Sequence, residues 1–261
     1  MYQTIRIDQD TRGVATLWLA RADKHNALSA QMLRDLTAAA GALGADASVR
    51  AVVLAAEGKS FCAGGDLAWM QEQMAATAEV RREGARELAY MLKAMNELPK
   101  PLIGRIHGNA FGGGIGMMSV CDVAIGAEGA KFGLTETRLG LIPATISPYV
   151  LARMGEDKAR RVFMSARIFD AEEAVRLNLL ASTVSPESLD AAVEAEVLPY
   201  LSVAPGAVAA SKRLARRLGP RIDDAVIEST IDDLVAVWEN DEAPHGIAAF
   251  FDKQKPRWQQ G

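Results

Sequence analysis

The sequence predicts an α/β fold with two parts, a mixed core over residues 1–198 and an all-helical region over residues 199–261. Three observations carry this prediction. The chain opens with two β-like runs, TIRID and GVATLWLA, and continuous apolar runs such as RAVVLAAEG are typical of buried strands flanked by helices. From about residue 186 onward, nearly every segment has a helical pattern. No Gly- or Ser-rich linker separates the two parts, so we expect the helical region to pack tightly.

The first elements are a hairpin and a helix. The turn-prone segment QDTRG separates the two β-like runs, which predicts an antiparallel pair. After RADKHNA, Ser29 is suited to cap a helix over roughly residues 29–43, because its hydroxyl can accept a backbone N–H bond of the first turn. The apolar residues of this helix lie on one side, at Met32, Leu33, Leu36 and Leu43.

Two glycine-rich loops then follow buried strands in the same layout. RAVVLAAEG leads into the loop SFCAGGD, and DLAWMQEQM begins a helix with Asp66 at its start. A long charged helix over residues 79–97 ends before Pro99, and the strand KPLIGRIHG leads into AFGGGIGMMSV at residues 110–120. Glycine costs backbone entropy, so this density of glycines indicates that bare backbone is needed here.

The rest of the core alternates short strands with helices between residues 121 and 185. The predicted strands are CDVAIGA and LLASTVS, and the predicted helices are ISPYVLARMG, EDKARRVFMSA and AEEAVRLN. The late region predicts four further helices, PESLDAAVEAEVLPYLSV, PGAVAASKRLARRLG, DDAVIESTIDDLVAVWEN and HGIAAFFDKQ.

Composition excludes several classes of protein. With 261 residues, 49% hydrophobic and 24% charged, the chain has the profile of an ordinary soluble globular protein. A net charge of -4 gives no electrostatic case for a nucleic-acid partner. The two cysteines form no C-x-x-C and the three histidines are scattered, so no metal site is expected. Without a signal core or an 18-residue apolar run, we expect a reduced, cytoplasmic protein that does not enter a membrane.

Familiar glycine motifs do not account for the two loops. EGKS suggests a phosphate-binding loop, but Val53 occupies the position where that motif requires its first glycine. GGGIG suggests a dinucleotide fingerprint, but Met117 occupies the position of its third glycine. G-x-S-x-G, which marks many serine hydrolases, does not occur.

A different chemistry fits both loops. Glycines between a strand and a helix expose backbone N–H groups, and such donors stabilise negative charge that develops on an oxygen. Two loops that each supply one N–H would form an oxyanion hole for a carbonyl that becomes enolate-like. A tight turn is the alternative interpretation of each glycine.

Taken together, these segments resemble the crotonase, or enoyl-CoA hydratase/isomerase, superfamily over nearly the whole chain. The resemblance is carried by RADKHNALS, SFCAGGDLAWM, HGNAFGGGIGMMSVCDVAIGAEGAKFGLTETRLGLIPA and AFFDKQKPRW. The combination AGGDLAWM, SVCDVAIG and GLIPATISPYV is most similar to bacterial 3-methylglutaconyl-CoA hydratases and to isohexenylglutaconyl-CoA hydratase-type proteins of terpenoid pathways. The resemblance implies a spiral of ββα repeats with a C-terminal helical trimerisation region, and a homotrimer or a dimer of trimers.

The resemblance also implies a binding site for an acyl-CoA substrate. It assigns the two oxyanion donors to the N–H groups of Gly65 and Gly113. It places the coenzyme A moiety along Ala63 and Gly64, with Leu28 lining the route. Coenzyme A enters as part of the substrate, so no separate cofactor is expected.

A lysine near the C-terminus belongs to the same resemblance. Lys253, in FFDKQK, matches a family lysine that reaches the CoA phosphate of a neighbouring subunit. A solvated surface lysine is the alternative interpretation.

The general acid/base implied by the resemblance is Glu136 in FGLTET. A buried carboxylate beside an apolar acyl pocket would have a raised pKa, suited to moving a proton to or from Cα. The sequence departs from the family at Gly116, where the best-known hydratases carry a first catalytic glutamate. Glycine cannot replace that carboxylate, so hydration by two carboxylates is not expected.

Three functions follow as hypotheses. The first is hydration of a branched or carboxylated 2-enoyl-CoA, with Glu136 as the sole catalytic carboxylate. The second is isomerisation of an enoyl-CoA double bond by the same glutamate, and the third is a non-catalytic role as an acyl-CoA-binding or scaffold protein. A carboxylated substrate would require a nearby cation, and Arg138 and Lys131 are the candidates, although both have the simpler interpretation of exposed surface charges.

Overall fold

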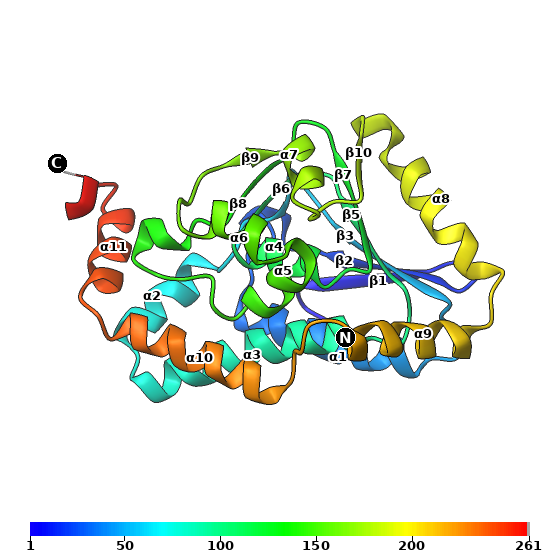
Figure 1. Ribbon diagram of the computed structural model, residues 1–261, viewed down its shortest axis with the longest axis horizontal. Coiled ribbons are helices and arrows are strands. Elements are labelled where there is room, and N and C mark those ends of the chain that lie inside the picture. Colours follow the sequence, from blue (N-terminus) through cyan, green and yellow to red (C-terminus); the bar gives the residue numbers. More distant parts are fainter. Residues whose placement is uncertain (260–261) are drawn as a thin grey trace.

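The computed structural model describes residues 1–259, which form two sheets covered by helices (Figure 1). The larger sheet has the spatial order β1-β2-β3-β5-β7-β10 and the smaller has the order β4-β6-β8-β9. The strands are β1 (Ile5–Gln9), β2 (Val14–Leu19), β3 (Ala51–Ala56), β4 (Ser60–Cys62), β5 (Leu102–Ile106), β6 (Asn109–Phe111), β7 (Val123–Ala127), β8 (Lys131–Gly133), β9 (Phe169–Asp170) and β10 (Ser182–Val184).

A ββα repeat organises the core. β3, β5 and β7 lie in the large sheet, and each is followed by a short strand, β4, β6 or β8, in the small sheet. Most pairings are parallel, and the antiparallel pairs are the predicted hairpin β1–β2 and the pair β8–β9. All six residues of β3 are buried, as expected for a parallel strand covered on both faces. The predicted α/β spiral is thereby confirmed.

Helices cover both faces of the large sheet. The α-helices are α1 (Ala30–Ala45), α2 (Leu67–Ala75), α3 (Ala78–Glu97), α4 (Gly113–Ser119), α5 (Ser147–Met154), α6 (Glu156–Phe163), α7 (Ala171–Arg176), α8 (Leu189–Leu201), α9 (Pro205–Leu218), α10 (Asp224–Trp238) and α11 (Glu242–Phe251). Apolar residues of α8, such as Val193, pack against Val53 and Ile103 on one face. On the other face, α1 and α3 contribute to the main core, for example through Leu36 and Leu92.

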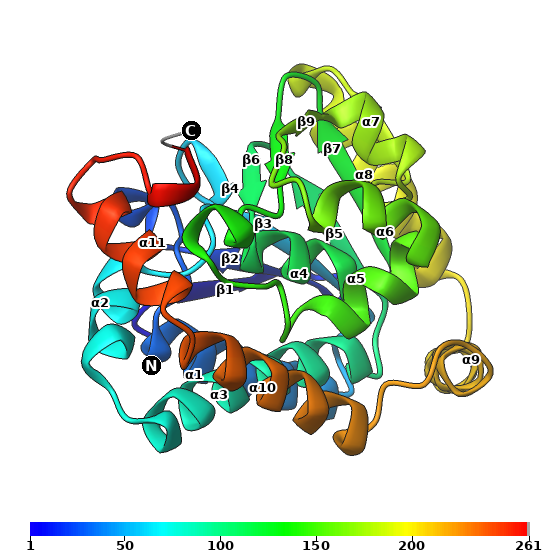
Figure 2. The same ribbon diagram turned by 60° about the vertical axis from the view of Figure 1, so that its left-hand side comes forward.

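The late helices take different places on this core. α10 packs along α3, where Ile227 and Ile231 meet Ala85 and Ala89. Figures 1 and 2 show α1, α3 and α10 together along one side, α11 near the C-terminus, and α9 at the end of the molecule away from α11. No residue of α9 is fully buried. The boundary predicted after residue 198 falls inside α8, and the division into a core and an oligomerisation region stays a prediction.

Several predicted element boundaries agree closely with the structure. Ser29 caps α1 by accepting the Met32 N–H, and Asp66 caps α2. Strand β4 lies within the segment SFCAGGD that was predicted to be a loop, and strands β6, β8 and β9 were not predicted; these four strands have two or three residues each. Among residues 1–259, no helix combines the length and the apolar character needed to cross a bilayer.

Candidate active site

The first glycine-rich loop connects β4 to α2 and is held by pairing with Leu28. The Leu28 N–H donates to the Gly64 carbonyl at 2.8 Å, and the Asp66 N–H donates to the Leu28 carbonyl at 3.1 Å. Gly64 has φ +96°, and a Cβ there would lie 3.1 Å from the Phe111 carbonyl oxygen. Glycine is therefore required at residue 64 by both conformation and space.

Asp66 fixes the end of this loop. Its carboxylate accepts from the N–H groups of Ala68 and Trp69 at 2.9 and 3.4 Å, and it forms an ion pair with Arg21 at 2.9 Å. Burial opposes ionisation, but the hydrogen bond from Arg21 and the two backbone donors outweigh it and hold the pKa of Asp66 below its usual value. Because Arg21 also donates to the Ala27 carbonyl, it ties this loop to the segment containing Leu28.

The second glycine-rich loop begins at the end of β6. Gly112 has φ +48°, and its N–H donates to the Gly133 carbonyl at 3.0 Å. Gly113 is the first residue of α4, so its N–H has no acceptor within the helix. Within residues 1–259, neither the Gly113 N–H nor the Gly65 N–H donates a hydrogen bond. A Cβ on Gly64 would lie 4.0 Å from the Gly113 nitrogen, so the two loops are adjacent.

Glu136 lies beside these donors, at the start of the turn η2 (Glu136–Leu139) that follows β8. Its Oε1 is only 2.9 Å from the position a Cβ on Gly112 would take. Its Oε2 is shielded from solvent and has no hydrogen-bond partner among the described residues. Burial raises the pKa of Glu136 to about 7, against a smaller lowering effect of its own backbone N–H. A carboxyl group in this state can both take and give a proton near neutral pH.

One cavity of about 510 Å³ joins these groups. Its wall contains all six residues that the sequence analysis assigned to the donors, the acid/base and the acyl-CoA route: Leu28, Ala63, Gly64, Gly65, Gly113 and Glu136. Apolar side chains from the core and the late helices close the rest, among them Leu33, Leu88, Leu141, Ile146, Leu234 and Trp238. A mostly apolar cavity with a few converging polar groups is typical of a small-molecule site.

Gly116 lies behind this wall and does not line the cavity. A Cβ at Gly116 would lie 2.6 Å from Cγ2 of Ile146 and 3.5 Å from Cδ1 of Leu92. Ile146 therefore fills the space in which a side chain at residue 116 would begin. The absent carboxylate at residue 116 was evident from the sequence, but the contact with Ile146 was not, because no local pattern connects these two positions.

Of the three cationic residues that the sequence analysis singled out, Arg138, Lys131 and Lys253, only Arg138 lies at the cavity. Arg138 is exposed, lines the cavity and forms no ion pair with any described residue. Lys131 and Lys253 are also exposed, but they lie outside the cavity wall. Arg138 is the one cationic side chain among the described lining residues.

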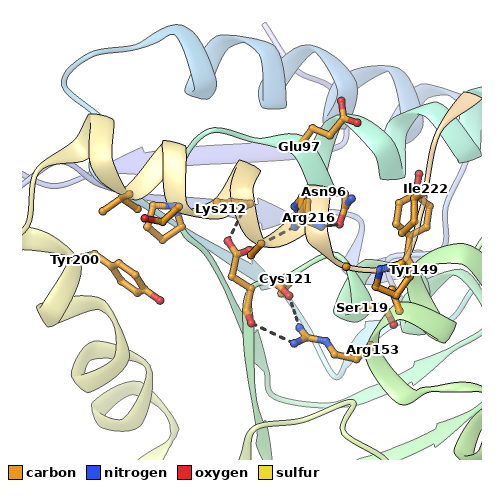
Figure 3. Close-up of a pocket in the computed structure, with 18 of the residues that line it drawn as sticks. Asn96, Glu97, Ser119, Cys121, Tyr149, Arg153, Tyr200, Lys212, Arg216 and Ile222 are labelled. Carbon is orange, nitrogen blue, oxygen red and sulfur yellow. Dashed lines mark hydrogen bonds and ion pairs between the residues drawn. The ribbon is translucent and has the colours of Figure 1, made fainter.

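A second, larger cavity of about 840 Å³ lies between α9 and the core (Figure 3). Its polar centre is Asp122, which pairs with Lys212 at 2.6 Å and Arg216 at 3.4 Å, while Arg153 donates to the carbonyls of Cys121 and Asp122. The ion pairs of Lys212 and Arg216, both on α9, hold this helix against the core. None of the predicted site residues lines this cavity, so its size does not make it the active site.

Other reactive groups do not form a competing site in the described chain. Burial raises the pKa of both Cys62 and Cys121 to about 12, so both thiols stay protonated near neutral pH and are poor nucleophiles. Residues 1–259 contain no group of three His, Cys, Asp or Glu side chains placed to hold a metal ion.

Known proteins are similar to this chain in both sequence and fold. A family model described as Enoyl-CoA hydratase/isomerase matches residues 9–261. The crotonyl-CoA hydratase of Syntrophomonas wolfei is 29% identical over 266 residues, which cover 97% of each chain. The structure of an enoyl-CoA hydratase from Shewanella pealeana has a TM-score of 0.81 at 35% identity and covers 99% of this chain and 97% of its own. An enoyl-CoA hydratase from Mycobacterium avium has a TM-score of 0.85 at 31% identity, covering 99% of this chain and 100% of its own.

Proposed function

The chain belongs to the enoyl-CoA hydratase/isomerase family, and from this premise we propose that it adds water to a 2-enoyl-CoA thioester. Glu136 is the single acid/base, and the N–H groups of Gly65 and Gly113 are the oxyanion donors. One observation carries the proposal: a buried carboxyl group with a pKa of about 7 and an unpartnered oxygen lies beside two backbone N–H groups that have no acceptor in the described chain. This arrangement also argues against a role limited to acyl-CoA binding, since such a role needs no proton carrier.

The proposed reaction proceeds through an enolate-like state. The thioester oxygen accepts hydrogen bonds from the Gly65 and Gly113 N–H groups, which draws electron density toward it and makes C3 electrophilic. Ionised Glu136 takes a proton from water while the water oxygen bonds to C3, and the C2–C3 π electrons move toward the thioester oxygen. The enolate then collapses as C2 takes the proton from Glu136. The sum is one water added across the double bond, with the carboxylate regenerated.

The finer substrate class that we propose is a branched or carboxylated enoyl group of the 3-methylglutaconyl type. Arg138 is the cation available to a substrate carboxylate in this cavity. A guanidinium group suits that role because its planar donors match a carboxylate in a two-bond geometry. Arg138→Gln is expected to raise KM for 3-methylglutaconyl-CoA and to leave KM for crotonyl-CoA, which has no second carboxylate, nearly unchanged.

Double-bond isomerisation is the second candidate, and the position of Ile146 favours it. Hydration by two carboxylates requires a second acid, and Ile146 occupies the space next to Gly116 where that side chain would begin. Isomerisation moves one proton from one carbon to another, so Glu136 alone is sufficient.

An assay of paired substrates separates these functions. The enzyme is incubated with crotonyl-CoA, 3-methylcrotonyl-CoA and 3-methylglutaconyl-CoA, and loss of the conjugated enoyl absorbance reports hydration. Parallel incubation with a 3-enoyl-CoA reports isomerisation through a gain of the same absorbance. Glu136→Gln is expected to abolish either activity, and full activity of this variant would refute the proposed mechanism.

We propose that the late helices also build a homotrimer or a dimer of trimers, in which Lys253 reaches the CoA phosphate bound by a neighbouring subunit. Large apolar side chains are exposed at the end of α8, between α8 and α9, and on α9, at Leu198, Val203, Leu214 and Leu218. Such residues are typical of interfaces when they cluster. Light scattering after size-exclusion chromatography gives the subunit number, and Leu214→Glu is expected to lower it.

A further inference from the structure

Two glycines bring α11 and the turn that carries Glu136 into direct backbone contact. Gly140 ends this turn with φ +72°, and a Cβ there would lie 2.6 Å from both the carbonyl carbon and the oxygen of Glu242, the first residue of α11. From the other side, a Cβ on Gly246 of α11 would lie 2.6 Å from the carbonyl carbon and oxygen of Leu139. Each backbone thus occupies the space that a side chain on the other would need.

A short series of contacts leads from this place to the carboxylate. The Leu141 N–H donates to the Glu136 carbonyl at 3.1 Å, and the Gly140 N–H closes the turn by donating to the Thr137 carbonyl at 3.3 Å. The Glu136 side chain then reaches Gly112, next to the free N–H of Gly113. A displacement of Gly140 would therefore move the carboxylate relative to the oxyanion donors.

The segment after α11 supports this contact from outside. Cη2 of Trp258 lies 2.9 Å from the position of a Cβ on Gly246, and its ring meets the His245 ring edge-on, with centroids 5.6 Å apart. Nε2 of His245 accepts the Arg257 N–H at 2.9 Å. α11 is therefore held between the catalytic turn and the chain that follows it.

We propose that α11 is a positioning element for catalysis, which sets Glu136 against the oxyanion donors through the paired glycines Gly140 and Gly246. This inference rests on the proposed acid/base role of Glu136. It gives the C-terminal helical region a function in the active site of its own chain, in addition to any role in assembly.

The contacts set the size of the expected effect. An ordinary contact of a Cβ is 3.4–4 Å, so a methyl group at either glycine requires a shift of about 1 Å by the opposing backbone. A misplacement of about 1 Å in a catalytic group can cost about 100-fold in rate. Backbone is the obstacle in both cases, so a change of side-chain rotamer cannot relieve the contact.

The test is a double-mutant cycle with a matched control. Gly246→Ala, Gly140→Ala and the double variant are compared with Gly41→Ala, a change within α1 where a Cβ has no neighbour within 4 Å. The measurements are kcat, KM and the pH profile of kcat/KM with a 2-enoyl-CoA, together with far-UV circular dichroism and binding of butyryl-CoA, a saturated ligand that cannot react.

We expect each single variant at the contact to lower kcat by about 10- to 100-fold, with little change in KM or in butyryl-CoA binding. Both changes push the same two backbone segments apart, so the double variant is expected to lose much less than the product of the two single losses. The apparent pKa in the pH profile of kcat/KM should be lower than that of the wild type, because Glu136 becomes more exposed to solvent. Arg138, on the same turn, forms no ion pair with Glu136 within the described chain, and Glu242, whose backbone meets Gly140, has a carboxyl group of the same charge type as Glu136.

Two results would overturn the inference. One is a folded Gly246→Ala or Gly140→Ala variant whose kcat and pH profile match those of Gly41→Ala. The other is a loss confined to KM and butyryl-CoA binding, which would assign α11 to ligand binding alone. A wild-type enzyme whose kcat/KM shows no ionisation near pH 7 would instead contradict the acid/base role of Glu136, on which the inference rests.

Discussion

Replacing Glu136 with glutamine should stabilise the folded protein at high pH while it removes activity. The carboxyl group is neutral when protonated, and its burial makes ionisation costly in the folded state. In the unfolded chain the same group ionises near its ordinary pKa of 4.5. Glutamine has nearly the same shape and carries no charge at any pH, so the variant lacks this cost.

The magnitude follows from the shift in pKa. A pKa raised from 4.5 to about 7 corresponds to about 3 kcal/mol of lost stability once the group is ionised in both states. The direction is fixed because the folded-state pKa is the higher one. The stabilising contribution of the protonated form is fully present below the unfolded pKa and is lost as the pH rises through about 7.

Urea unfolding of wild type and Glu136→Gln at about pH 5 and about pH 9 measures this difference. Most of the roughly 3 kcal/mol should appear as a gain in the relative stability of the variant at the higher pH. Glu128→Gln, at an exposed residue after β7, is the matched control and should show no such gain. Equal pH dependence in wild type and Glu136→Gln would refute a carboxyl group buried in the way described.

Three further changes test other parts of the site. Gly116→Glu should not create a second catalytic carboxylate, and an increase in hydration rate would contradict this. The same change should destabilise the fold by about 1–3 kcal/mol or more in thermal unfolding, because Ile146 must move. Arg138→Gln should raise KM about 10-fold or more for a carboxylated enoyl-CoA alone, and an equal effect on crotonyl-CoA would show that Arg138 does not bind the acyl carboxylate. Asp122→Asn should destabilise the protein by about 3–5 kcal/mol in urea unfolding, since it leaves the largely buried Lys212 without its carboxylate partner. An unchanged midpoint of urea unfolding would show that the ion pairs of Asp122 do not hold α9.

The large sheet and most helices could be predicted because their signals are local. β3 is apolar throughout, as required of a strand covered on both faces, and Ser29 and Asp66 cap the helices that follow them. The small sheet could not be predicted in the same way. Its strands have two or three residues, too few for any periodicity to be read, and they form by pairing between distant loops.

The candidate site likewise has features that the sequence predicted and one that it could not predict. The glycine density indicated two loops with bare backbone, and the family resemblance assigned Gly65, Gly113 and Glu136; the structure brings all three to one cavity. Their catalytic roles stay predictions. The sequence could not show that Ile146 fills the space beside Gly116, because that contact joins residues with no shared local pattern.

The pH dependence of kcat/KM for the wild-type enzyme with a 2-enoyl-CoA tests the central claim most directly, since this ratio reports the ionisation of the free enzyme. Hydration and isomerisation both begin with ionised Glu136. We therefore expect activity to rise with pH through a single ionisation near 7, and we expect Glu136→Gln to abolish this activity. A profile that is flat through neutral pH, or one with its ionisation near the ordinary value of 4.5, would contradict a buried Glu136 as the acid/base.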